Sequence, residues 1–124
     1  MSMKYTSDHE WARLDGDLVV VGITDFAQNQ LGEVVFVELP DVDRQVAQGE
    51  EAAVVESVKA AGEVKAPVAG VVVEVNEALA DEPEKVNDDP TGSGWFYKIR
   101  PTDATQLSAL MDESSYQSLL ESLA

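Results

Sequence analysis

The chain has 124 residues, no cysteine and a formal net charge of −16, from 24 acidic against 8 basic residues. This length suits one domain with its own hydrophobic core. The charge argues against nucleic-acid or anionic-membrane partners, which need a basic surface, and the lack of cysteine excludes disulfides and thiol nucleophiles. Any sulfur chemistry must therefore come from a group added to the chain.

The first predicted elements are two strands with a short helix between them. Residues 18–24 are rich in valine, which favours a strand. A helix is expected over 25–31, because Thr24 can cap its first turn and Gly32 suits the position after its last turn. Residues 33–40 predict a second strand, which a proline ends.

A β-hairpin with a lysine at its tip is expected next. The turn region 41–50 leads to strands predicted at 51–57 and 63–67, and Lys59 lies between them. A further strand is predicted at 70–79.

The last third changes from strand to helix. Residues 78–94 are acidic and contain Pro and Gly, which is typical of a loop. A strand is expected at 95–100. Apolar residues then recur at helical spacing, which predicts helices within 103–111 and 113–124, the second capped by Asp112.

Together these elements predict one mostly β domain over residues 1–124, a sandwich of two small antiparallel sheets. The sandwich would occupy about 4–100 and a helical segment about 102–124. Residues 32–38 and 70–76 share the pattern Gly-x-Val-Val-x-Val, which would suit two similar halves but equally fits two valine-rich strands that resemble each other by composition alone.

Lys59 stands out because basic residues are scarce and its neighbours are small. Ala60, Ala61 and Gly62 follow it, so the ammonium group would be accessible. A lone lysine is most often only a solvated charge. A tight turn between two strands would instead hold it on a rigid support, where a modifying enzyme can recognise it by position.

At these residues the sequence resembles the glycine cleavage system H proteins, and the resemblance extends along nearly the whole chain. The segments that carry it are HEW (9–11), GITDFAQNQLGEVVFVELP (22–40), ESVKAAGEVKAPVAGVVVEVNEAL (56–79), VNDDPTGSGWFYKI (86–99) and LMDESSYQSLL (110–120). The resemblance implies the barrel-sandwich hybrid fold of lipoyl and biotinyl domains.

The resemblance also implies a non-catalytic carrier with lipoate joined as an amide to Lys59. In the family's cycle, a pyridoxal-phosphate glycine decarboxylase loads an aminomethyl group onto the lipoyl arm, and a tetrahydrofolate-dependent aminomethyltransferase takes the carbon. Dihydrolipoamide dehydrogenase, which uses FAD and NAD, then reoxidises the dithiol. Lipoate-attaching enzymes are further implied partners. We expect a location in the bacterial cytoplasm, or in the mitochondrial matrix of a eukaryote.

Two groups of site residues follow from the resemblance. Enzymes that attach lipoate would recognise the residues around the acceptor, namely Glu56, Ser57, Val58 and Ala60.

Glu10 and Glu63 would dock the loaded arm. Either carboxylate could pair with the protonated amine and so prevent the collapse that releases formaldehyde and ammonia. The sequence departs from the usual family pattern at Gly62, Glu63 and Lys65, which affects the shape of this docking site.

Other readings of the same residues lead to different functions. A lipoyl domain of a 2-oxo acid dehydrogenase should carry an Ala/Pro-rich linker, which is missing here. A biotinyl domain should have Met beside its lysine, where this chain has Val58 and Ala60. A Ser–Lys hydrolase using Ser57 and Lys59 would need a buried lysine with a lowered pKa. For Trp11, composition alone favours a position at the surface.

Overall fold

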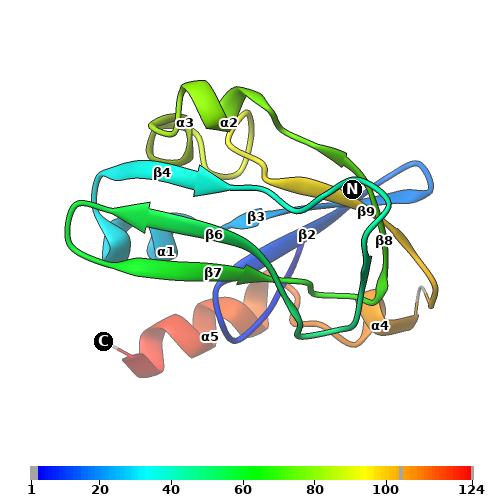
Figure 1. The fold of residues 1–124 in the computed structure, drawn as a ribbon. Helices are drawn as coiled ribbons and strands as arrows, with labels where there is room; N and C mark the ends of the chain where they lie inside the picture. Colours follow the sequence, from blue (N-terminus) through cyan, green and yellow to red (C-terminus); the bar gives the residue numbers. More distant parts are fainter. Residues whose placement is uncertain (1–2, 104, 124) are drawn as a thin grey trace.

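The computed structural model describes residues 3–103 and 105–123, and it contains two antiparallel sheets that face each other (Figure 1). The larger sheet has six strands, in the order β1 (Lys4–Tyr5), β2 (Glu10–Asp15), β3 (Leu18–Ile23), β9 (Tyr97–Pro101), β8 (Gly70–Val75) and β5 (Gln45–Val46). The smaller has three, in the order β4 (Val34–Glu38), β6 (Glu51–Ser57) and β7 (Ala61–Lys65). The predicted fold class is therefore confirmed.

Five helices accompany the sheets in the described part of the chain. They are α1 (Asp25–Leu31), α2 (Ala78–Asp81), α3 (Lys85–Asp88), α4 (Thr105–Ser108) and α5 (Glu113–Leu123). None of the helices in this part is both long enough and apolar enough to span a bilayer.

Helix α1 has the predicted bounds, and its two ends show why. The Thr24 hydroxyl accepts the N–H of Ala27 at 3.3 Å. At the other end Gly32 takes a φ of 81°, which side chains disfavour. The predicted cap of α5 is also present, because Asp112 Oδ1 accepts the N–H of Ser115 at 2.8 Å.

Several elements were not predicted. Strands β1 and β5 have two residues each, and β2 carries an arginine and two acids among its six residues. The segment expected to be a loop, 78–94, contains α2 and α3, which are single turns without side-chain caps and so give no start signal. The predicted domain limits at 1 and 124, and residue 104 of the predicted helical segment, lie outside the described residues.

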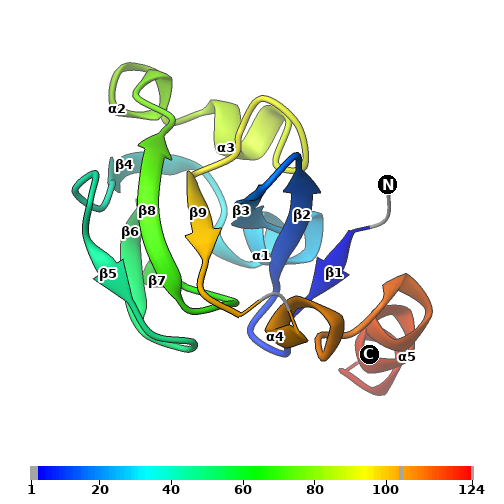
Figure 2. The same ribbon diagram turned by 90° about the vertical axis from the view of Figure 1, so that its right-hand side faces the viewer.

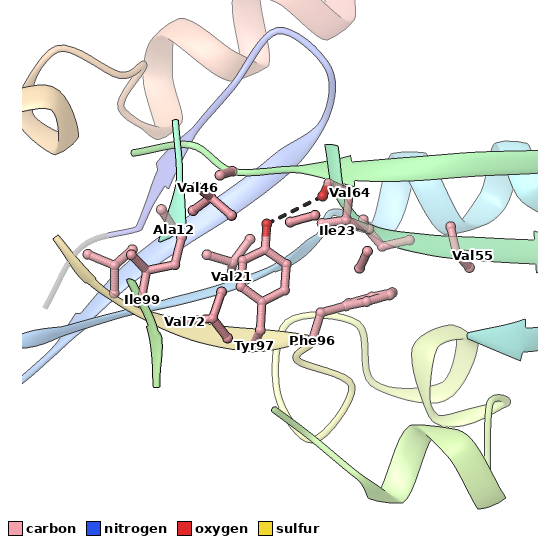
Figure 3. Close-up of a cluster of buried hydrophobic side chains, with 14 of the residues drawn as sticks. Ala12, Val21, Ile23, Val46, Val55, Val64, Val72, Phe96, Tyr97 and Ile99 are labelled. Carbon is pink, nitrogen blue, oxygen red and sulfur yellow. Dashed lines mark hydrogen bonds between the residues drawn. The ribbon is translucent and has the colours of Figure 1, made fainter. Parts of the chain in front are cut away.

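The core lies between the two sheets and is almost entirely apolar (Figure 3). Val21 and Val72 come from the larger sheet, and Val55 and Val64 from the smaller one. Each such side chain contributes about 1.5–3 kcal/mol when fully buried. The Tyr97 hydroxyl donates to the carbonyl of Val64 at 3.3 Å and so links the sheets.

The expectation that Trp11 lies at the surface is wrong. Its side chain is completely buried, and its Nε1 donates to the carbonyl of Pro90 at 2.9 Å. The ring covers Gly22, its neighbour on β3. A Cβ atom at Gly22 would lie only 2.6 Å from two ring atoms, so only glycine fits there. The sequence signal favoured the surface because polar residues precede Trp11, and it could not show the loop that covers the ring.

Helix α5 packs beside β1 at the edge of the larger sheet (Figure 2). Tyr116 stacks on Tyr5 with their ring centroids 4.5 Å apart. The Tyr116 hydroxyl also lies 2.7 Å from Thr24 Oγ1 and 2.9 Å from His9 Nδ1. The C-terminal helix is thereby tied to the cap of α1, which is close to the candidate site.

Candidate functional site

Lys59 is exposed in the turn that joins β6 to β7, at the left end of Figure 1. We call residues 57–60 the acceptor turn. The Ser57 hydroxyl accepts the N–H groups of Lys59 at 3.3 Å and of Ala60 at 3.0 Å, and it donates to the Ala60 carbonyl at 3.1 Å. The Ser57 N–H donates to the same carbonyl at 2.7 Å. The turn is therefore closed by a side chain and needs no glycine.

The aliphatic stem of Lys59 lies over bare backbone at the end of α1. A Cβ atom at Gly32 would be 3.2 Å from Lys59 Cε, so the missing side chain leaves a notch for the stem. The N–H of Val58 donates to the carbonyl of Glu33 at 3.1 Å, which holds the turn against this notch.

Asn87 on α3 fixes the backbone beneath the notch. Its Oδ1 accepts the N–H of Val34 at 2.9 Å, and its Nδ2 donates to the Gly32 carbonyl at 2.8 Å and to Gln28 Oε1 at 2.9 Å. One side chain thus ties α1 to β4 at the base of the acceptor turn. Sequence reasoning missed this role, since the residue falls in a segment that was expected to be a loop.

The predicted recognition residues surround the acceptor. Glu56, Val58 and Ala60 are exposed, Val58 to 68%, and Ser57 is half-buried because it closes the turn. The structure therefore brings all four together beside Lys59.

Two hollows lie along the hairpin, beyond the acceptor turn. The near hollow, of about 190 Å³, lies between α1 and the hairpin and is lined by apolar side chains that include Phe26, Leu31 and Val55. The far hollow, of about 360 Å³, is lined by residues that include Glu10, Lys65 and Met111. Asp8 lines both, so the two are adjacent. Its carboxylate is 3.6 Å from Lys65 Nζ.

Glu10 is a buried carboxylate at the wall of the far hollow. Only 2% of it is exposed, yet both of its oxygens have partners. Oε1 accepts from the Thr6 hydroxyl at 2.6 Å, and Oε2 accepts the N–H of Lys65 at 3.2 Å. Burial raises the pKa of Glu10, and these two hydrogen bonds oppose that rise. No sequence pattern marks Thr6 as its partner.

Glu63 has a different environment from Glu10. It is exposed and lines the near hollow, and a hydrogen bond with Glu51 raises its pKa. The two predicted carboxylates thus have separate partners and belong to separate hollows.

Comparison with known proteins identifies the family of this chain. Residues 3–123 match the model of the family described as glycine cleavage H-protein. A glycine cleavage system H protein of Methylocella silvestris is 57% identical over 99% of this chain and 98% of its own. One from Beijerinckia indica is 58% identical over 97% of both chains.

A solved structure is also similar over almost the whole chain. The crystal structure of a glycine cleavage system H protein from Mycobacterium marinum matches with a TM-score of 0.88 and 40% identity, over 97% of each chain. With a family match of this length and relatives this close, the chain belongs to the glycine cleavage H-protein family, the non-catalytic lipoyl shuttles of glycine cleavage.

Proposed function

We propose that Lys59 carries the lipoyl group, joined as an amide to its Nζ. The observation that supports this most directly is the acceptor turn. It presents an exposed lysine on a rigid hairpin, with its stem in the notch at Gly32. When bound, lipoate supplies a dithiol that this cysteine-free chain lacks.

The geometry favours this role over a Ser–Lys hydrolase. The Ser57 hydroxyl has its donor and acceptor capacity engaged within the turn, with Lys59 N–H, Ala60 N–H and the Ala60 carbonyl. Lys59 is exposed, whereas a general-base lysine needs a site that removes it from water.

Peptide mapping by mass spectrometry tests this assignment. After incubation with lipoate, ATP and a lipoate ligase, we expect one lipoyl adduct, on Lys59. Lys65 should stay unmodified, because it lies within β7, half-buried, with Nζ 3.6 Å from Asp8. An adduct on another lysine, a biotinyl adduct after expression, or an unmodified protein with esterase activity would each contradict the proposal.

The partners follow from membership of the glycine cleavage system. We propose that the protein receives an aminomethyl group from the pyridoxal-phosphate decarboxylase, passes it to the tetrahydrofolate-dependent aminomethyltransferase and is reoxidised by dihydrolipoamide dehydrogenase. The relatives named above are bacterial, which supports a bacterial cytoplasmic location. The net charge of −16 favours partners with basic docking faces.

We further propose that Glu10 protects the loaded carrier. Its carboxylate is buried at the wall of the far hollow, where an ammonium group would be paired in surroundings of low dielectric. Pairing keeps the amine protonated, so its lone pair cannot expel the neighbouring sulfur. Glu63 is the second candidate, but it is exposed, and exposed pairs contribute only about 0–1 kcal/mol.

A Glu10→Gln variant should shorten the lifetime of the loaded carrier while leaving lipoylation unchanged. Formaldehyde release from loaded protein, measured without the transferase, gives this lifetime. Because burial raises the pKa of Glu10, the carboxylate loses its charge at a higher pH than an exposed glutamate does. Release from wild type should therefore be slower than from the variant above that raised pKa, and the two rates should converge as the pH falls through it, because a protonated Glu10 no longer pairs with the amine.

Thermal stability provides the control for Glu10→Gln. A carboxyl group with a raised pKa binds its proton more tightly in the folded state. Its ionisation therefore costs stability as pH rises above the unfolded value of about 4.3. Glutamine avoids this cost and still offers Lys65 N–H an oxygen, so the variant should melt no lower than wild type at neutral pH. Equal release rates for the two proteins would remove Glu10 from the mechanism, and Glu63→Gln tests the second carboxylate in the same way.

A further inference from the structure

Three exposed apolar residues lie in the acceptor turn or on the strand next to it. Val35 and Phe36 are each 48% exposed and Val58 is 68% exposed. They make up half of the six exposed large apolar residues in the described part of the chain; the others are Leu14, Val42 and Leu123. Single exposed apolar residues are ordinary, but a cluster is typical of a binding surface. We call Val35, Phe36 and Val58 the acceptor corner.

A β-bulge in β4 creates this corner. Val34 pairs with Ser57 and Phe36 with Glu56, so Val35 is an extra residue in the strand. In a regular strand, alternate residues face opposite sides, and Phe36 would share the buried side with Val34. The bulge instead leaves Val34 and Val37 buried and turns both Val35 and Phe36 towards solvent. Bulges often re-aim side chains next to functional sites.

The bulge also limits what can bind at this edge. Strand β4 is an edge strand of the smaller sheet, and an irregular edge is a poor template for an added strand. A partner is therefore expected to contact the side chains of the corner and not to extend the sheet.

The strand register places acidic residues around the corner. Phe36 pairs with Glu56, and Glu56 pairs with Ala61 on β7. These three residues form a row across the smaller sheet, on its outer face and next to the acceptor turn. In the next row, Val54 lies between Glu38 and Glu63. A complementary face would thus have an apolar pocket for Phe36 within a basic rim.

The closeness of the acceptor corner to Lys59 indicates which partner binds there. The row of Phe36 and Glu56 adjoins the acceptor turn, and Glu56 is three residues before Lys59. Enzymes that use the carrier act on the far end of the lipoyl arm. The enzyme that attaches lipoate must instead bring the activated lipoyl carbonyl carbon to Nζ, where the amide forms as AMP leaves and Nζ loses a proton. Of these partners, it is the one whose active site has to reach the turn itself.

We propose that the acceptor corner is the docking surface for the lipoate-attaching enzyme, with Phe36 as its anchor. This inference depends on the proposal that Lys59 is the acceptor. Large aromatic side chains are the commonest anchors of protein interfaces, and here one lies on a rigid sheet beside the reacting lysine.

Steady-state lipoylation kinetics of a Phe36→Ser variant test the proposal. With a purified lipoate ligase, lipoate and ATP, kcat/KM for the carrier should fall about tenfold or more, as expected for an interface anchor. The fall should lie in KM, since the chemistry at Nζ is unchanged. Phe36→Leu should recover most of the loss by keeping an apolar anchor.

Val42→Ser is the matched control, because Val42 is 50% exposed but lies beyond the opposite end of β4. It should leave kcat/KM unchanged, and all the variants should melt as wild type does. If Phe36→Ser and Val42→Ser behave alike, the corner is not a docking surface for this enzyme. If only loading by the decarboxylase is slowed, the corner serves another partner and the proposal is wrong. A wild-type protein that takes no lipoate on Lys59 would overturn the proposed function as well.

Discussion

A Lys59→Arg variant is expected to take up no lipoate and to unfold at the same temperature as the unmodified wild-type protein. Arginine retains the positive charge, but its guanidinium group stays protonated and cannot form the amide. Lys59 is exposed, and its backbone N–H bonds to Ser57 whatever side chain it carries, so the fold should not change. Intact mass after incubation with lipoate, ATP and the ligase measures the uptake.

Lys65→Arg is the matched control for this experiment. Lys65 is in the same hairpin, but its side chain is half-buried and its backbone N–H donates to Glu10. This variant should be lipoylated fully on Lys59. Full lipoylation of Lys59→Arg would show that the acceptor has been assigned to the wrong residue.

The second large effect is on stability, and it arises where Trp11 covers Gly22. Trp11→Ala should lower the free energy of unfolding by about 3–5 kcal/mol, because it empties a fully buried site. Gly22→Ala should cost about 1–3 kcal/mol or more, since its Cβ would lie 2.6 Å from the ring. Chemical denaturation of the two single variants and of the double variant measures both effects.

The double variant shows whether the cause is this contact. With the ring removed, Gly22→Ala should cost much less than it does in the wild-type protein, which gives a coupling energy of about 0.5–3 kcal/mol. Gly62→Ala is the control, because a Cβ there would come no closer than 3.7 Å to the nearest atom. Additive effects of Trp11→Ala and Gly22→Ala would mean that the glycine is required for another reason.

The sequence predicted those elements whose signals are local. Helix α1 has its cap residue and its terminal glycine in the sequence itself, and β6 has the bounds that were expected. Membership of the H-protein family was also visible, because the resembling segments run in order along nearly the whole chain.

What could not be predicted depends on contacts between distant residues. Asn87 is 53 positions from Val34, and Trp11 is 79 positions from Pro90, so no local pattern marks either pair. The bulge at Val35 was missed for a related reason. A run of apolar residues in β4 suggests a strand but does not show where the register shifts. Lys59 as the acceptor and Glu10 and Glu63 as docking residues stay predictions.

The notch at Gly32 affects how tightly the protein surface must bind a group attached to Lys59. Because the stem of Lys59 starts from a fixed place beside the near hollow, a group attached to Nζ would meet this surface as part of the same molecule. Short flexible tethers give effective concentrations of about millimolar. A surface that binds the free group with only millimolar affinity would then be occupied about half of the time. The free-energy difference between the bound and the released arm would then be small. A partner enzyme could therefore draw the arm away easily, and protecting the arm on the carrier would not hinder its delivery to the enzyme.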